Sequence, residues 1–512
     1  MEPVKDLIAK AMETIKAWDS RKKLLTLLIV WALIFLPSIA VYTSIHRKTQ
    51  FAYYPESSSP IESKNVDWNV TVYPEGNMSR ENYVITVEEG QTVNFEWSAE
   101  NYTAKVHVGQ VSVYFNTTWG KKGLVRLHHS AEESKEQNET WKSSKTFENS
   151  GKIYFHFRVD KSDIARFYNR AAVIIEGDNV YEKVRTGPPP LIHFYFIPPT
   201  VLAPPAAVGG YFLSFYVYFS LFILLDSILL FYTFRRWDEN KAFLSSLLFI
   251  ANPISFYTLF QDEGIIAFTI ILSLFLVIEG KKKIGALSIG LGSITKVWSG
   301  FLIPAQLFDR DCEFKKRFTH IIMSLVILSI SLLSFYLVWG PKTLWFISFY
   351  GGSAAKSTLG GVSIWSYLSK TTLISESMIR SKVILTSIAC FELFFLYKAY
   401  KKRWDMISVF TVTLAFFLLF YPKVHWEYYL MLLPTLLFYT VRHKKLFVSY
   451  IIFISCLTLA RGVRDLSAYP DYLTLLMGFI SSLAFTLIGL WIICQFLNEN
   501  ISTSYLPTEP SG

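Results

Sequence analysis

The sequence predicts a polytopic α-helical membrane protein that carries an outer β-sandwich domain. Hydrophobic residues make up 52% of the 512 residues, and charged residues only 18%. Several apolar runs are longer than the roughly 18 residues that mark a membrane-spanning helix. Residues 66–160 instead alternate apolar and polar side chains, which is typical of short strands separated by turns.

The formal net charge of +10 does not indicate a nucleic-acid-binding protein. The excess Lys and Arg lie in short clusters beside apolar runs, which is the positive-inside pattern of membrane proteins. The first apolar run, residues 24–42, follows Ser-Arg-Lys-Lys and lacks a cleavage site of small residues. We therefore expect a retained signal anchor with the N-terminus in the cytoplasm.

The apolar runs, the alternating stretch and the clusters of Lys and Arg divide the chain into five parts. They are a cytoplasmic N-terminus with the first transmembrane helix (1–45), an extracytoplasmic β-domain (46–160), an outer amphipathic loop (161–207), a transmembrane bundle (208–498) and a cytoplasmic tail (499–512). The predicted location is the cell membrane, with both termini inside and the β-domain outside.

Glycosylation signals support an outer position for the β-domain. Five Asn-x-Ser/Thr sequons lie there, at Asn69, Asn77, Asn101, Asn116 and Asn138. All four cysteines lie outside residues 50–190, so we expect neither a disulfide framework nor a thiolate metal site in this domain. A glycosylated outer domain without disulfides favours an archaeal cell membrane.

Charge clusters set the expected topology of the bundle. After the first span, we expect spans at about 208–234, 242–260, 264–279, 319–339, 382–398, 405–421, 429–441, 445–461 and 473–496. The apolar run 284–308 has basic residues at both ends, so both ends should lie inside. We therefore expect a re-entrant pair of short helices, broken within residues 290–300, and about 12 membrane segments in all.

The alternating stretch predicts strands near 83–87, 93–97, 111–115 and 153–159. Residues 84–97 and 150–159 resemble the corresponding strands of cupredoxin-like domains. A blue-copper site needs a cysteine with two histidines, and the domain has no cysteine. We therefore expect no metal there and interpret the domain as a partner-binding or bundle-capping module.

An amphipathic helix is predicted directly after the β-domain. Ser162 is a good N-cap, Asp163 suits the dipole of the first turn, and Gly177 is a typical terminator. One apolar stripe is formed by Ile164, Phe167, Tyr168, Ala171, Ala172 and Ile175. The polar residues off this stripe are Arg166, Asn169, Arg170 and Glu176. We expect the helix to lie on the membrane surface at the mouth of the bundle.

The motifs in this loop resemble the first outer loop of GT-C fold glycosyltransferases, in particular the mannosyltransferase-like members that use polyprenyl-phosphate sugars. The matching residues are Asp163, Tyr168, Gly177, Tyr181, Pro188, Pro189 and Pro190. Residues 252–268 with 280–304, and residues 421–434, resemble later segments of the family. The inserted β-domain departs from many members, and the lack of a clear Asp-x-Asp pair weakens any case for a bound metal.

The resemblance implies inverting transfer of a sugar, such as mannose, from a polyprenyl (dolichyl) phosphate to an acceptor hydroxyl on the outer face. Asp163 would be the general base, which must lie within hydrogen-bond distance of the acceptor oxygen. Candidates for binding the donor phosphate are Lys296, His425, Arg185 and Lys423. Candidates for binding the acceptor or substrate are Tyr168, Tyr181, Asp262, Glu263 and Glu427. The acceptor would be a glycan, a lipid or a protein, and no cofactor is implied.

Simpler roles exist for several of these residues. Asp163 could merely cap its helix, Lys296 could extend toward an interface, and Asp262 and Glu263 could be solvated loop residues. Asp226 lies inside a predicted span and needs a polar partner, for which Lys296 is one candidate.

Two other classes of function remain open. One is a transporter or flippase for a lipid-linked or small solute, which would often show two matched halves. The other is a non-catalytic scaffold that acts through the β-domain. Convergence of Asp163, Lys296 and His425 on one lipid-accessible cavity would favour the enzyme, whereas scattered positions would favour the scaffold.

Overall fold

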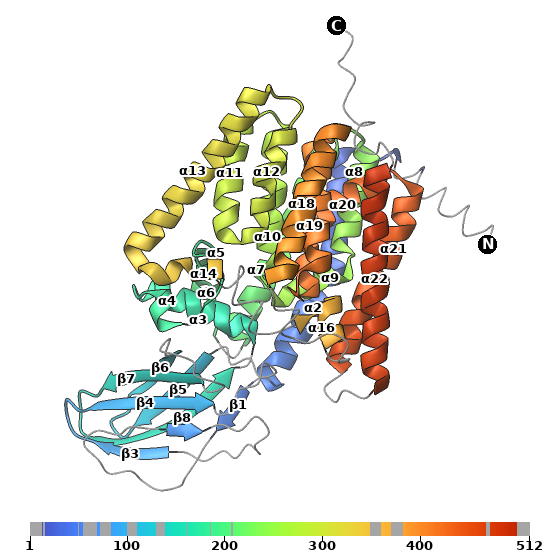
Figure 1. The fold of residues 1–512 in the computed structure, drawn as a ribbon. Helices are drawn as coiled ribbons and strands as arrows, with labels where there is room; N and C mark the ends of the chain where they lie inside the picture. The colour runs from blue at the N-terminus through green and yellow to red at the C-terminus, as the bar shows by residue number, and fades with distance from the viewer. Residues whose placement is uncertain are drawn as a thin grey trace, which may run out of the picture.

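The protein consists of a helical bundle with a small region of strands against one end (Figure 1). The computed structural model describes residues 13, 16–49, 51–54, 69–71, 83–99, 110–129, 139–160, 162–184, 186–205, 208–348, 360–369, 382–466 and 472–498. Helix α3, which contains the predicted catalytic residue, lies between the two parts. We call the strands β1–β8 the β-region, and the neighbouring end of the bundle the α3 end.

Six helices in the described residues are long and apolar enough to cross a membrane. They are α2 (Ser20–Thr49), α7 (Gly210–Phe234), α13 (Phe314–Trp339), α18 (Lys382–Lys402), α21 (Lys444–Leu466) and α22 (Tyr472–Asn498). A seventh candidate is α8 (Glu239–Ile250), which continues through a 47° bend into α9 (Pro253–Tyr257) and η2 (Thr258–Phe260). These helices indicate a multi-pass membrane protein.

The remaining predicted segments of the bundle form shorter helices. They are α10 (Glu263–Ile278), α19 (Met406–Phe420), and η8 (Trp426–Met431) followed by α20 (Leu433–Thr440). The candidate spans are therefore fewer than the roughly 12 membrane segments predicted, although helices do occupy the predicted positions. Short connecting elements are η5 (Pro341–Leu344), α14 (Trp345–Ser348), β9 (Gly360–Gly361), α16 (Ile364–Leu368) and β10 (Lys423–Val424).

The apolar run 284–308 forms a hairpin. Its elements are α11 (Lys282–Thr295), η3 (Val297–Phe301), α12 (Leu302–Ala305) and η4 (Gln306–Phe308). Lys296 interrupts the helix with extended backbone angles. Lys282 Nζ lies 2.9 Å from Asp309 Oδ2, so the two ends of the hairpin lie together. The break falls within the predicted interval, and the chain reverses there as the basic flanks predicted.

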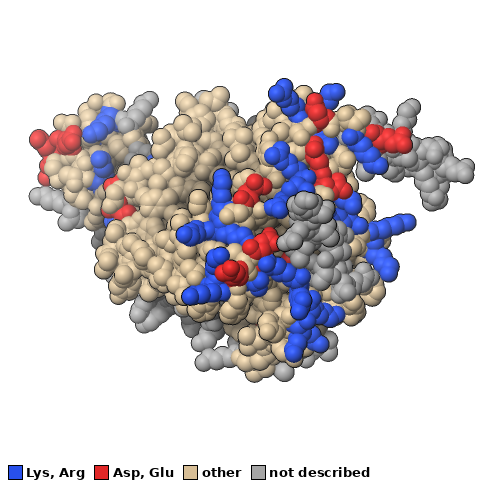
Figure 2. Space-filling model, turned by 90° about the horizontal axis from the view of Figure 1, so that it is seen from above, with Lys and Arg blue, Asp and Glu red and all other residues tan. Residues whose placement is uncertain are grey.

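Basic side chains predominate at the end of the bundle farthest from the β-region (Figure 2). The connections at this end contain the exposed residues Arg235, Arg236, Lys281, Lys283, Lys315, Lys316, Lys401, Lys402 and Arg403. A bond from Arg236 Nη1 to the Ile278 carbonyl ties the last turns of α7 and α10 together here. We call this end the basic end.

The β-region packs around one apolar core. Its strands are β1 (Phe51–Tyr54), β2 (Asn69–Thr71), β3 (Tyr83–Val87), β4 (Thr92–Ala99), β5 (Gln110–Thr117), β6 (Lys122–His129), β7 (Glu139–Thr146) and β8 (Gly151–Asp160). The order is β1-β8-β5-β6-β7-β4-β2, with β3 also paired to β8. Pairing is antiparallel except between β2 and β4, and β6 joins one set of strands to the other. The buried core includes Ile85, Val93, Phe95, Val113, Phe115, Leu127, Trp141 and Phe155.

Helix α3 spans Asp163–Ile175 and has the predicted ends. The Ser162 hydroxyl accepts a hydrogen bond from the Ala165 amide, and Gly177 adopts φ +84°. It is followed by α4 (Val180–Lys183), α5 (Ile192–Tyr195) and α6 (Ile197–Val201).

The burial of α3 extends beyond the predicted apolar stripe. Asn169 and Arg170, which lie off the stripe, are only 1% and 8% exposed, whereas Ile175, on the stripe, is 49% exposed. Phe167 packs edge-on against Phe219 of α7, while β5 approaches from the β-region. The helix is covered on two sides, so one apolar stripe does not describe its burial.

The hairpin leads to a prediction about membrane sides. In a background with the four native cysteines changed to Ser, Lys281→Cys and Asp311→Cys should react with a membrane-impermeant maleimide from the same face. Their positions beside the Lys282–Asp309 ion pair are the reason. Thr118→Cys, in the exposed turn after β5, should react only from the other face. Labelling of the two hairpin ends from opposite faces would contradict the re-entrant interpretation.

Candidate functional site

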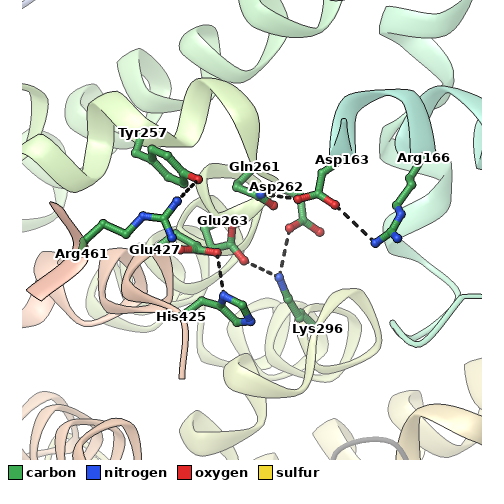
Figure 3. A network of polar contacts seen from close by, with 10 residues as sticks. All are labelled: Asp163, Arg166, Tyr257, Gln261, Asp262, Glu263, Lys296, His425, Glu427 and Arg461. Carbon is green, nitrogen blue, oxygen red and sulfur yellow. Dashed lines mark hydrogen bonds and ion pairs between the residues drawn. The ribbon is translucent and has the colours of Figure 1, made fainter. Parts of the chain in front are cut away.

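A cluster of charged side chains lies at the α3 end of the bundle (Figure 3). Four segments that are far apart in sequence meet there: the first turn of α3, the start of α10, the break in the hairpin, and the start of η8. The predicted site residues in the cluster are Asp163, Asp262, Glu263, Lys296, His425 and Glu427. Asp163, Lys296 and His425 thus lie in one cluster of side chains.

Lys296 is the centre of this cluster. Its Nζ lies 3.0 Å from Asp262 Oδ1 and 2.6 Å from Glu263 Oε1, and all three side chains are almost fully buried. The Tyr428 ring lies 5.2 Å from Nζ and provides a cation–π contact. The carboxylates are at the N-terminus of α10, where the helix dipole favours negative charge.

The possibility that Asp226 pairs with Lys296 is wrong. Asp226 is fully buried in α7, and neither carboxylate oxygen has a hydrogen-bond partner among the described residues. Lys296 instead pairs with the two carboxylates at the start of α10. Sequence position alone could not decide which carboxylate pairs with Lys296, because all of the candidate carboxylates lie in or beside apolar segments.

Asp163 is the most accessible carboxylate of the cluster. Its side chain is 33% exposed, whereas those of Asp262, Glu263 and Glu427 are 6%, 2% and 8% exposed. Asp163 Oδ2 accepts a 2.7 Å hydrogen bond from Gln261 Nε2. Because Gln261 directly precedes Asp262, this bond links Asp163 to the buried ion pairs.

Arg166 lies on the same helix as Asp163, one turn further along. Its Nη1 is 3.5 Å from Asp163 Oδ1, and both side chains are partly exposed. Neither Gln261 nor Arg166 was assigned a role from the sequence. Gln261 lies in residues 252–268, and the resemblance of that stretch to GT-C fold enzymes was the available signal.

His425 and Glu427 form the other flank of the cluster. His425 Nδ1 lies 3.7 Å from Glu427 Oε1, and the His425 ring is 5.5 Å from the Tyr428 ring. The strand β10 just before His425 pairs in parallel with β9. A Cβ on Gly361, which has φ +84°, would collide with the Val424 carbonyl, so only glycine fits this approach.

Arg461 extends the cluster beyond Glu427 (Figure 3). Its Nη2 donates a 2.7 Å hydrogen bond to the Tyr257 hydroxyl, and its guanidinium lies 5.0 Å from the same ring. The sequence analysis did not identify Arg461. The available signal was a charge within the predicted span 445–461, a position that is often functional.

A second set of buried polar groups lies beside Asp163. Arg170 has no ion-pair partner among the described residues, and its Nε has no hydrogen-bond partner. Burial, and then the charge of Arg166, lower the pKa of Arg170 to about 10, although Asp262 and Asp163 are near enough to oppose this. The guanidinium therefore carries a charge that no neighbouring carboxylate fully compensates.

Two neighbours of Arg170 are also incompletely bonded. Both amide atoms of Asn169 lack hydrogen-bond partners in the described part of the chain. His193 Nε2 lies 3.2 Å from Thr186 Oγ1, while its Nδ1 has no partner there. Burial, and then the charge of Arg170, lower the pKa of His193 well below its usual value, so His193 is neutral. Unsatisfied buried polar groups are costly, so this set indicates a place for a polar ligand or water.

Several predicted site residues have other contacts. The Tyr168 ring stacks on Tyr211 at 4.6 Å and its hydroxyl accepts from Arg126, while the buried Tyr181 donates to the Pro188 carbonyl. The structure does not bring either hydroxyl into the cluster. Lys423 pairs with Gly360 through its backbone in β10, two residues before His425. Arg185 lies outside the described residues.

The sequons are described only in part. Asn116 is exposed near the end of β5, a position that suits a glycan. Asn69 lies in β2, but its side chain is outside the described part, and so are Asn77, Asn101 and Asn138 as a whole. In the described residues, no group of three or more His, Cys, Asp or Glu side chains could hold a metal ion.

The central ion pairs predict a large effect on stability. Lys296→Met should lower the free energy of unfolding by about 3–5 kcal/mol, because it leaves two buried carboxylates without their cation. Changing Asp262 and Glu263 to amides in the same variant should restore most of the loss. The exposed Lys342→Met is a matched control and should change stability by at most about 0.5 kcal/mol.

The measurement is unfolding of the purified protein in detergent, followed by temperature or denaturant. A triple variant as unstable as Lys296→Met would show that the carboxylates do not depend on the Lys296 charge.

Comparison with known proteins does not assign the chain to a family: no protein-family model and no curated protein matches it.

Proposed function

We propose that the protein is a membrane glycosyltransferase. It would move a hexose, such as mannose, from a polyprenyl (dolichyl) phosphate to the hydroxyl of a glycan, lipid or protein acceptor. The observation that supports this most directly is the position of Asp163, an accessible carboxylate held at the edge of a buried, ion-paired cluster. The resemblance of residues 160–440 to GT-C fold enzymes supplies the reaction class.

The proposal places the cluster at the outer face of the cell membrane. The basic end lies opposite and would face the cytoplasm together with both termini. The exposed Asn116 in the β-region agrees with an extracytoplasmic, glycosylated position for that part.

Asp163 would act as the general base. An acceptor hydroxyl would donate a hydrogen bond to its carboxylate and attack the anomeric carbon of the donor sugar. The new acceptor–carbon bond forms as the bond from carbon to phosphate oxygen breaks, and the electron pair leaves with the phosphate. The acceptor proton passes to Asp163, and inversion follows from attack opposite the leaving group. Gln261 holds Oδ2 of this carboxylate in place.

The structure changes which cation we assign to the phosphate. Lys296 is already held between two carboxylates, so it serves as an organiser of the site. Arg170 is buried, lacks an ion-pair partner in the described chain, and has a planar guanidinium suited to phosphate oxygens. We therefore propose that Arg170 contacts the donor phosphate, with the partly exposed His425 as the second candidate.

A transporter or flippase would also use charged groups within a bundle. It would move its substrate without forming a glycosidic bond, so an assay of sugar transfer separates the two functions. A scaffold acting through the β-region would leave the buried cluster without a role.

The first prediction of this proposal concerns Asp163→Asn. Membranes that contain the purified wild type should transfer label from polyprenyl-phosphate mannose or glucose to total host lipid. The Asp163→Asn variant should lose roughly 100-fold or more of this activity, because the amide cannot accept the proton. Asp178→Asn, three residues beyond the end of α3, is the matched control. Equal transfer by a folded Asp163→Asn variant would move the base elsewhere, with Asp262 next. Failure of the wild type with both donors would contradict the proposed function.

The second prediction separates Arg170 from Lys296. Arg170→Met should raise the KM for the donor by roughly 10- to 100-fold, the loss expected for a charge-assisted hydrogen bond of about 1.5–3 kcal/mol. The same change should leave the unliganded protein at least as stable, because it removes a buried charge that is not fully compensated. Thermal unfolding and transfer kinetics measure the two effects. Destabilisation as large as that of Lys296→Met would assign Arg170 a structural role instead.

A further inference from the structure

The β-region reaches the catalytic helix through the side chain of Arg126 in β6. Arg126 Nη1 lies 2.5 Å from Glu176 Oε1, just beyond the last turn of α3. Arg126 Nη2 donates a 3.1 Å hydrogen bond to the Tyr168 hydroxyl in the middle of the helix. One guanidinium thus contacts α3 at two points about two turns apart.

The Tyr168 ring transmits this contact to the bundle. Arg126 Cζ lies 5.2 Å from the ring centroid, and the opposite contact is a stack on Tyr211 at 4.6 Å. Tyr211 belongs to the first turn of α7, a candidate membrane span. A continuous path of contacts therefore runs from β6 through α3 to α7.

In the middle of α3, the contacts with the bundle are apolar. Phe167 stacks on Phe196 at 4.5 Å and packs edge-on against Phe219 at 5.9 Å. Apolar packing opposes separation but is non-directional, so it restricts sliding and rotation of a helix less than hydrogen bonds do. The directional contacts from Arg126 add this restriction in the middle and at the end of α3, beyond the bond between Asp163 and Gln261 at its first turn.

We infer that Arg126 is a positioning residue for sugar transfer, through which the β-region holds α3 and Asp163 in register with the bundle. The part of this inference that concerns activity rests on the proposed function. Asp163 lies five residues before Tyr168, about 7.5 Å along the helix axis. A small rotation of α3 would break the 2.7 Å bond between Asp163 and Gln261, and a misplacement of about 1 Å can cost roughly 100-fold in rate.

The variant to test is Arg126→Ala, with Lys121→Ala as the matched control. Lys121 lies in the turn between β5 and β6, and its ion-pair partner is the exposed Glu148 rather than a residue of α3. Arg126→Ala should lower kcat by about 10- to 100-fold and change the donor KM by less than about threefold, because the base is displaced while the phosphate contact remains. Arg126→Lys, which keeps the charge near Glu176, should recover part of kcat. Lys121→Ala should behave as the wild type.

Tyr168→Phe provides a second variant that keeps the ring stack and removes only the hydroxyl. If Arg126 acts through this hydroxyl, the effects of Tyr168→Phe and Arg126→Ala on kcat should be non-additive in the double variant. Additive losses, or an unchanged kcat in a folded Arg126→Ala protein, would overturn the inference while leaving the glycosyltransferase proposal intact.

Hydrogen exchange of the α3 amides tests the same inference without an assay. Arg126→Ala in the full-length protein should raise exchange across residues 165–175 by at least about tenfold relative to Lys121→Ala, because the helix loses its directional contacts. Equal exchange in the two variants would overturn the inference. A wild type that transfers no sugar would instead count against the proposed function, and the exchange result would still decide whether Arg126 holds α3.

Discussion

The site depends on one buried ammonium group placed between two carboxylates. Lys296 occupies the break in the hairpin, where extended backbone separates α11 from η3, while Asp262 and Glu263 begin α10. Burial of any one of these charges alone would cost several kcal/mol, so each requires the others. Their pairing joins the hairpin to α10, and Gln261, next to Asp262, extends the connection to Asp163.

The charged side chains around Lys296, Asp262 and Glu263 are distributed unevenly across the site. Four acidic and four basic side chains gather there. The basic ones are Lys296, Arg166 and Arg461, which Figure 3 shows, and Arg170, which lies near Asp163. The arrangement is nevertheless uneven, because both arginines of α3 lie near Asp163, while the buried Glu427 occupies the opposite flank. An anionic donor group would be favoured on the α3 side, beside the proposed base. This placement would bring the reacting carbon between Asp163 and the departing phosphate.

The sequence predicted those features that short stretches of residues determine, such as helix ends and chain reversals. The Ser162 cap and Gly177 defined the ends of α3, and basic flanks predicted the reversal of the hairpin near Lys296. The sequence could not predict which side chains from distant segments contact one another. The period of α3 shows one apolar face and cannot show which other elements cover its polar side, so the burial of Asn169 and Arg170 was missed. Similarly, hydropathy could not say whether Asp226 or the start of α10 faces Lys296.

The β-region is connected to α3 covalently as well as through Arg126. Strand β8, which pairs with β1, β3 and β5, ends at Asp160 and leads directly into the cap of α3. A strand held by three neighbours fixes the position of the first turn, where Asp163 lies and bonds to Gln261. The contacts of Arg126 with Tyr168 and Glu176 lie further along the helix and restrain its rotation there. The two attachments therefore complement one another, which gives a physical reason for placing a folded β-region immediately before the helix that carries the proposed base.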